Sequence, residues 1–255
     1  MAWEFSVLFA AACLAGAINS VAGGGTIVTF PALIAFGMPS IQANATSTLA
    51  LLVGIAGSLY GYRARLPAAR PWLKAFAPVS IAGGLFGAWL LTRTSEKFFD
   101  HLVPFLILFA TVLFLLNNVV RRLAGIKPSG GSPAVTVMAV LLQLGVAVYG
   151  GYFGAGIGIL MLATMGLVGL HHIHEMNAIK TILGALINVV AAAWFVFAGL
   201  IVWPQALVMM AGATIGYFLG SHCSQKIPQQ HVRGLVGLIG ISLSAVFFWR
   251  EFFAR

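Results

Sequence analysis

The stretch Val21-Ala22-Gly23-Gly24-Gly25-Thr26 interrupts a long apolar run, and Tyr152-Phe153-Gly154-Ala155-Gly156-Ile157-Gly158 interrupts another in the same way. Glycine inside a helix costs about 1 kcal/mol relative to alanine, so each stretch predicts that a helix stops there. In lipid, the peptide groups freed by such a stop must be buried in protein or line a watery cavity. Paired glycine breaks in two halves of a chain indicate a transporter binding site.

The composition supports a membrane environment. Hydrophobic residues make up 60% of the chain and charged residues only 7%, unlike a soluble domain. Residues 5 to 62, 128 to 174 and 181 to 225 contain no Asp, Glu, Lys or Arg, and each run exceeds the roughly 20 residues that one span needs. We therefore predict an all-α, polytopic membrane protein. The net charge of +9 is assigned to short basic loops rather than to a nucleic-acid partner.

The first break separates two segments that are short for a membrane span. Residues 5 to 20 and 26 to 37 predict helices of about 24 and 18 Å, against a hydrocarbon core of about 30 Å. They therefore predict a broken or re-entrant helical hairpin. Three further spans are predicted at 44 to 62, 74 to 92 and 101 to 119.

The second half repeats the first. An offset of 131 places Gly23 on Gly154, and an offset of 133 places Asn44 on Asn177 and Pro71 on Pro204. We predict a first repeat over residues 1–125, a cytoplasmic linker at 126–133 and a second repeat over 134–255. Each repeat holds one hairpin and three transmembrane helices. Because the hairpin returns to its own side and the remaining spans are odd in number, the repeats are predicted to be inverted.

The distribution of basic residues predicts the orientation. Loops 62 to 74, 120 to 133 and 221 to 233 carry basic residues, whereas loops 38 to 43 and 199 to 204 carry no charge. By the positive-inside rule the former are cytoplasmic, which places both termini in the periplasm. Arg250 and Arg255, near the C-terminus, run against this orientation.

The substrate site is predicted where the two breaks meet. Helix N-termini offer unpaired N–H groups and the positive end of a dipole, a combination that attracts anions. Asn44 and Asn177 could instead be plain helix caps, and Lys180 could reach the membrane surface or pair with Glu175. The predicted substrate-binding residues are Gly23, Gly24, Gly25, Thr26, Asn44, Thr46, Ser47, Thr48, Gly154, Gly156, Gly158, Asn177, Lys180 and Thr181.

Other chemistry is not indicated. His171-His172-Ile173-His174-Glu175 resembles a metal motif, but adjacent histidines point in different directions, so we interpret it as a solvated interfacial segment. The sequence shows no Ser/His/Asp set and no phosphate-cradling loop. We therefore predict no catalytic residues, no metal and no cofactor, and a protein that is not an enzyme.

The same residues resemble a known family. Ala15-Gly16-Ala17-Ile18-Asn19-Ser20 before the first break, Gly150-Gly151-Tyr152 before the second, and Ala178-Ile179-Lys180 are similar to the TauE/SafE family of sulfite and organosulfonate exporters. The resemblance covers almost the whole chain. It implies export of sulfite, a sulfonate or a related small anion across a bacterial inner membrane. Members similar to this chain often have Tyr-Asp-Gly where it has Gly150-Gly151.

The predicted function is therefore export of a small sulfur-containing oxyanion, with membrane lipid as the surrounding partner. Efflux of an anion down a cell-negative potential gains about 2.3 kcal/mol per 100 mV for each charge, so it needs no acidic proton relay. Uniport and coupling through a proton carried by the substrate are both compatible with this hypothesis. An anion channel and an importer of the same solute are alternatives, and an intramembrane enzyme is a weaker one. The sequence leaves the anion, the direction of transport and the oligomeric state open.

Overall fold

The computed structural model describes residues 2–21, 24–61, 66–124, 133–167, 170, 173–223 and 229–253. In these ranges the secondary structure is entirely helical, as the sequence predicts. The helices are α1 (Ala2–Val21), α2 (Thr26–Ala35), α3 (Ser40–Gly61), α4 (Leu66–Arg93), α5 (Glu96–Ala124), α6 (Pro133–Tyr152), α7 (Ile157–Leu167), α8 (Ile173–Phe197), α9 (Trp203–Cys223) and α10 (Gln229–Phe252).

Three described stretches are long and apolar enough to cross a membrane: Trp3–Ser20, Trp72–Arg93 and Ala178–Phe197. The outer faces of the long helices also expose large apolar side chains, among them Phe86, Phe105, Leu141 and Phe218. Exposed apolar surface on this scale is costly in water and favourable in lipid. The protein is therefore a helical membrane protein.

Two predicted boundaries are wrong. The segment before the first break is not a short helix, because α1 covers 20 residues, or about 30 Å at 1.5 Å per residue. Of the two helices of this hairpin, α2, with 10 residues, is the one too short to span. The predicted basic loop at 62 to 74 is largely helical, since α4 begins at Leu66 and includes Arg70 and Lys74. Arginine and lysine are good helix formers, so a basic run does not by itself end a helix.

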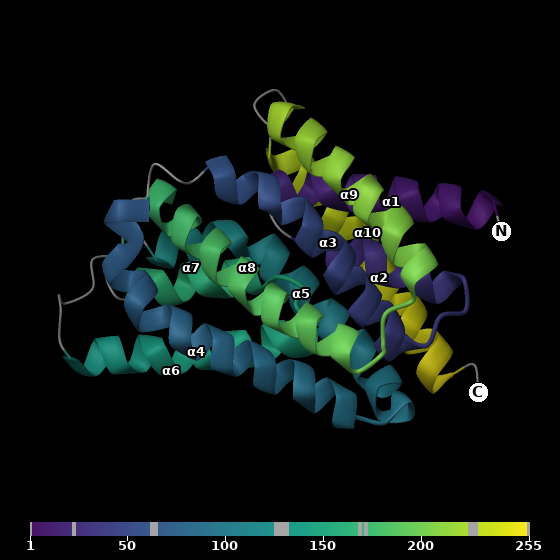
Figure 1. Ribbon diagram of the computed structural model, residues 1–255, viewed down its shortest axis with the longest axis horizontal. Helices are drawn as coiled ribbons and strands as arrows, with labels where there is room; N and C mark the ends of the chain where they lie inside the picture. The colour runs from purple at the N-terminus through teal and green to yellow at the C-terminus, as the bar shows by residue number, and fades with distance from the viewer. Residues whose placement is uncertain are drawn as a thin grey trace.

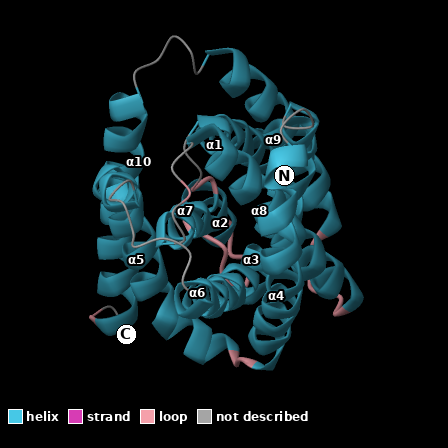
Figure 2. Cartoon of the chain, turned by 90° about the vertical axis from the view of Figure 1, so that its left-hand side faces the viewer, coloured by secondary structure: helices cyan, strands magenta, loops and turns pink. Residues whose placement is uncertain are grey.

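The pairs of helices that pack together follow a pattern that repeats after five helices. α1 lies along α9 and α6 lies along α4, while α5 packs against α10 and α3 against α8. If five is added to each helix number, with the count returning to α1 after α10, the pair α1–α9 becomes α6–α4. The pairs α5–α10 and α3–α8 become themselves. Figure 1 shows α4 beside α6 on one flank and α1 beside α9 on the other. In the end-on view of Figure 2, the short helices α2 and α7 lie in the middle of the bundle.

Glycines allow the two outer pairs to pack closely. A Cβ at Gly216 of α9 would meet the carbonyl oxygen of Cys13 on α1, and one at Gly83 of α4 would lie 2.9 Å from the carbonyl oxygen of Leu144 on α6. Small residues allow such backbone approach between membrane helices. The two contacts correspond, because Gly216 follows Gly83 by 133 positions and Leu144 follows Cys13 by 131.

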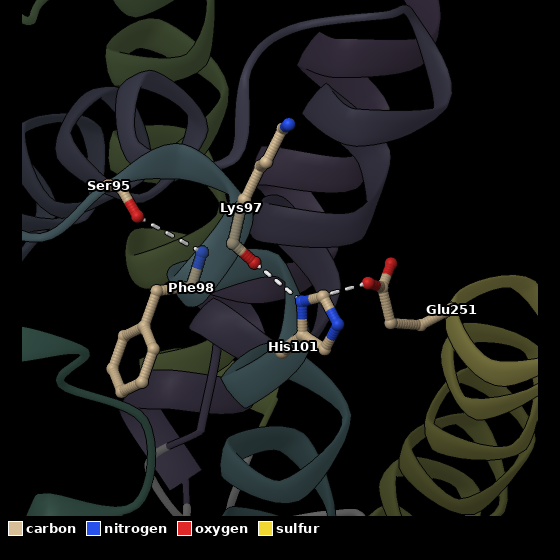
Figure 3. Close-up of polar contacts among 5 residues, drawn as sticks. All are labelled: Ser95, Lys97, Phe98, His101 and Glu251. Carbon is tan, nitrogen blue, oxygen red and sulfur yellow. Dashed lines mark hydrogen bonds and ion pairs between the residues drawn. The ribbon is translucent and has the colours of Figure 1, made fainter.

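One end of the bundle gathers several connections, and we call it the terminal end because both chain termini lie there (Figure 1). Glu96 Oε1 accepts from the N–H of Ile41 at 2.9 Å, which caps the start of α3. His101 Nδ1 lies 2.7 Å from the Lys97 carbonyl oxygen and 3.0 Å from Glu251 Oε1, so the first turns of α5 are held to the end of α10 (Figure 3).

Candidate functional site

The second break is a turn between α6 and α7. The N–H groups of Phe153 and Gly154 both donate to the Tyr149 carbonyl, at 2.9 and 3.2 Å, and the helix goes no further. Gly154 and Gly156 have φ of 79° and 76°, a region that other L-residues rarely adopt. The glycines therefore mark a real helix stop inside the bundle, as the sequence predicts.

Side chains satisfy the carbonyl groups that this stop sets free. Asn44 on α3 donates from Nδ2 to the Tyr152 carbonyl at 3.0 Å, and the Tyr149 hydroxyl donates to the Ala155 carbonyl at 2.8 Å. Membrane-embedded peptide groups need such partners, because no bulk water can replace them. Asn44 thus connects the first half of the chain to the break of the second half.

The Asn44 side-chain amide has a hydrogen-bond partner for its nitrogen but not for its oxygen. The residue is 1% exposed, and its Oδ1 has no hydrogen-bond partner among the described residues. A buried acceptor left without a donor costs about 1–3 kcal/mol. The second break therefore has a buried acceptor that no described group satisfies.

The first break is held by a different set of residues. Gly24 has φ of 100°, and the N–H of Gly25 donates to Asn19 Oδ1 at 2.7 Å. Asn19 also hydrogen-bonds to Tyr217 of α9, whose ring lies where a Cβ of Gly54 would be. Gly23 lies outside the described residues. Thr26 is the first residue of α2, as the sequence predicts.

The polar residues of α3 form hydrogen bonds with different parts of the structure. Ser47 and Thr29 are fully buried, and their hydroxyl oxygens are 2.6 Å apart, which joins α3 to α2. Thr48 donates to the carbonyl of Asn44 in its own helix at 2.8 Å. Thr46 accepts from the N–H of Val202 at 3.2 Å, so it holds the connection before α9. Asn44, Ser47 and Thr48 share a helical face by spacing, and Thr46 does not.

In the second half, Lys180 lies beside the second break. Its Cδ would be 3.1 Å from a Cβ at Gly158, so its aliphatic stem crosses the first turn of α7. Lys180 and Thr181 are both partly buried on α8 and both have partners. The side chain of Asn177 lies outside the described residues. Lys180 follows Ser47 by 133 positions, and each residue packs against the short helix of its own half.

The two breaks are linked through α2. Phe30, in the middle of α2, packs edge to face on Phe153 in the second break, with ring centroids 5.5 Å apart. Phe99 of α5 closes the same cluster, and all three rings are buried. Among the described residues, no hydrogen bond or ring contact joins Gly24–Thr26 directly to Gly154–Gly158. A cluster of three buried aromatic rings therefore lies on one side of the second break.

Sequence reasoning missed four polar residues that serve the breaks: Asn19, Thr29, Tyr149 and Tyr217. A usable signal existed for Asn19, Thr29 and Tyr149, because each is a polar side chain within six residues of a glycine break. Tyr217 carried no local signal, since its position on α9 is distant in sequence. No group of His, Cys, Asp and Glu that could hold a metal occurs in the described part of the chain. His171, His172 and the side chain of His174 lie outside that part.

Replacing Gly156 with alanine should lower the thermal unfolding midpoint of the purified protein. The nearest atoms of Ala110 are 3.6 Å from the added methyl group, so there is room for it. The cost instead arises from a left-handed backbone, about 1–2 kcal/mol for an L-residue. Gly184→Ala in α8 is the matched control, because it meets nothing within 4 Å and should raise the midpoint slightly. Equal midpoints for the two variants would show that the turn at Gly156 is misplaced.

Comparisons with known proteins agree with this architecture. The model of the family described as "Sulfite exporter TauE/SafE" matches residues 8–247. The chain is 29% identical over 246 residues to "Probable membrane transporter protein ORF9" of Sinorhizobium sp, covering 93% of this chain and 89% of the relative.

Two further relatives carry similar names. The chain is 28% identical over 242 residues to "Probable membrane transporter protein" of Haemophilus influenzae, covering 94% of this chain and 92% of the relative. It is 28% identical over 241 residues to "Probable membrane transporter protein YfcA" of Escherichia coli, covering 94% and 87%. No solved structure matches the chain. With a family model that spans both breaks and all the long helices, this chain belongs to the TauE/SafE sulfite exporter family of membrane transporters.

Proposed function

We propose that this chain exports a small sulfur-containing oxyanion, such as sulfite or a sulfonate, across the bacterial inner membrane. The observation that carries the proposal is Asn44, a buried amide from the first half whose NH2 group donates to a carbonyl in the break of the second half and holds a second N–H that can donate to an anion. Polar groups are buried at this depth only where they are needed, because lipid offers them no solvation.

Lys180 and the start of α7 would provide the attraction for an anion. The first-turn N–H groups of α7 carry the positive end of its dipole, and the stem of Lys180 crosses that turn at Gly158. A lysine charge and a helix N-terminus both favour a negative solute. The second N–H of the Asn44 amide adds a donor at the end of α6, on the other side of the second break. Gly23 to Thr26, Asn177 and Thr181 complete the proposed site by their place in the repeat.

Two inverted repeats would give alternating access. The same set of packed helix pairs is obtained when five is added to each helix number. The close contacts at Gly83 and Gly216 also correspond at the sequence offsets of 133 and 131 that relate the two halves. Such symmetry lets one half rock against the other around a fixed site. Packed interfaces are bistable rather than continuously deformable, so two discrete states are expected.

The basic residues, which the positive-inside rule counts, support a periplasmic terminal end. Four of the five acidic residues lie at that end: Glu4, Glu96, Asp100 and Glu251. Most basic residues fall in the sequence segments 62 to 74, 120 to 133 and 221 to 233, which include the end of one long helix or the start of the next. This asymmetry is the one that the positive-inside rule relates to a cytoplasmic face.

Efflux from proteoliposomes tests the proposal. Vesicles loaded with sulfite, sulfate, thiosulfate or methanesulfonate are clamped at set potentials, and anion release is measured. We expect saturable sulfite efflux that rises as the interior becomes more negative. Lys180→Ala should reduce it about tenfold or more, because a hydrogen bond to a charged group contributes about 1.5–3 kcal/mol. Lys74→Ala, an exposed lysine of α4, should leave efflux unchanged.

Three outcomes of this assay would contradict the proposal. Absence of flux for every anion would remove the substrate class. Flux that depends strictly on a pH gradient and ignores voltage would contradict efflux driven by the membrane potential. Flux that does not saturate with anion concentration would indicate a channel instead of a carrier.

A further inference from the structure

A cavity of about 220 Å³ opens at the terminal end of the bundle. It lies between the first turns of α1, the connection from α2 to α3, and the start of α9. Its polar side chains are Glu4, Gln42 and Gln205, and most of the remaining wall is apolar. No Lys, Arg or His is among the described residues that line it. The cavity is therefore electronegative and unsuited to the anion proposed above.

The amide of Gln205 is oriented by Glu4. Gln205 Nε2 donates to Glu4 Oε1 at 3.2 Å, and this bond connects the start of α9 to the start of α1. The reverse orientation would place an amide oxygen against a carboxylate oxygen, two acceptors without a proton between them. Gln205 Oε1 is consequently buried without a hydrogen-bond partner among the described residues. The Gln205 amide therefore presents its NH2 group to Glu4 and holds that carboxylate at the cavity.

Two tryptophans place the cavity at the level of the lipid headgroups. Trp3 precedes Glu4 and is 70% exposed, and Trp203 lies two residues before Gln205 and is 50% exposed. Exposed tryptophans gather at the membrane–water interface, where the ring is in contact with both lipid and water. A ligand can therefore reach Glu4 from the aqueous phase or from the headgroup layer.

We propose that this cavity binds a primary ammonium group, supplied by a free amine or by the headgroup of phosphatidylethanolamine. An ammonium has three N–H donors and no acceptor. The Glu4 carboxylate provides acceptor oxygens and one formal negative charge, and Gln42 and Gln205 are the other polar residues that line the cavity. The apolar wall, with Leu33 and Phe36, suits the carbon atoms that the ammonium carries.

Other cations fit this cavity less well. A calcium ion takes six to eight oxygen ligands, more than these side chains provide. A quaternary ammonium has no N–H to donate to the Glu4 carboxylate, and it is bound by cages of several aromatic rings, whereas Phe36 is the single ring among the described lining residues. The site goes beyond the proposed anion export and does not depend on it.

Titration with methylammonium tests the proposal on the purified full-length protein in an uncharged detergent. A ligand that binds the folded state raises the unfolding midpoint. We expect methylammonium to raise it and tetramethylammonium, at equal concentration, to leave it unchanged. Glu4→Gln and Gln205→Leu should each weaken methylammonium binding about tenfold or more, because charge-assisted hydrogen bonds are the strong ones. Asp100→Asn removes a charge at the same end of the bundle but outside the cavity, and should bind like wild type.

The elution profile and unliganded midpoint of each variant show whether it is folded. Gln42→Leu provides a further test if Glu4→Gln does not fold. Equal responses to methylammonium and tetramethylammonium, or full binding by folded Glu4→Gln, would overturn the proposal. The proposal would also be overturned if methylammonium gave no response and no phosphatidylethanolamine were retained in the lipid-binding assay described next.

The second assay separates the two sources of ammonium. Wild type and Glu4→Gln are purified from nanodiscs of phosphatidylethanolamine or phosphatidylcholine, and bound lipid is measured by native mass spectrometry. Retention of phosphatidylethanolamine by wild type, lost in Glu4→Gln, assigns the site to the headgroup. A methylammonium response without lipid retention assigns it to a free amine. Phosphatidylcholine, which has no N–H, should not be retained in either protein.

Discussion

Replacing Gly216 with leucine is expected to prevent α1 and α9 from packing and to abolish the folded bundle. A Cβ at this position would meet the carbonyl oxygen of Cys13, which is backbone, so no side-chain rotation can relieve the contact. Overpacking a membrane or protein interior costs about 1–3 kcal/mol, and more where the backbone must move. We expect a loss of about 3 kcal/mol or more. The measurement is the monodisperse yield and the thermal unfolding midpoint in detergent.

The corresponding position in the first half should behave alike. A Cβ at Gly83 would lie 2.7 Å from the Ala147 methyl group and 2.9 Å from the Leu144 carbonyl oxygen, so Gly83→Leu should separate α4 from α6. Gly145→Leu on α6 is the matched control, because that position is exposed and meets nothing within 4 Å. It should elute like wild type. A normal midpoint for Gly216→Leu would refute the α1–α9 packing.

Replacing Asn44 with leucine should both destabilise the protein and stop transport. The Tyr152 carbonyl would lose its donor while remaining buried, at a cost of about 1–3 kcal/mol. The second break would then lack the side chain that holds it from the other half. We expect sulfite efflux from proteoliposomes to fall at least about tenfold in the fraction of protein that remains folded, the factor that 1.4 kcal/mol represents.

Gln143→Leu separates the effect of Asn44 from general loss of a buried amide. Gln143 is also fully buried, donates to Ser80 Oγ at 2.9 Å and has an unpartnered Oε1, but it lies between α4 and α6 and serves neither break. Ser80 can bond to a carbonyl of its own helix once the amide is gone. Efflux should therefore be unchanged in Gln143→Leu. Similar efflux in Asn44→Leu and Gln143→Leu would exclude Asn44 from the proposed substrate site.

Local sequence was sufficient for the helix breaks, because glycine conformation is a local property. Gly24, Gly154 and Gly156 have positive φ at the places where the apolar runs were predicted to stop. Helix lengths were predicted less well. The apolar signal of α1 begins after Glu4, yet the helix begins at Ala2. An acidic residue in the first turn interacts favourably with the helix dipole, so a charged residue there lies within the helix and does not mark its boundary.

The amino-acid sequence by itself determined the membrane environment, the all-helical architecture and the positions of the breaks, because these follow from hydrophobicity and from glycine. Only the tertiary structure decided which side chains serve each break. Asn44 and Tyr152 are 108 residues apart, and no periodicity relates a donor on α3 to a carbonyl at the end of α6. Thr46, two residues from Asn44, faces the connection to α9 instead. Partners across a bundle depend on which helix faces pack together, and that is a property of the whole chain.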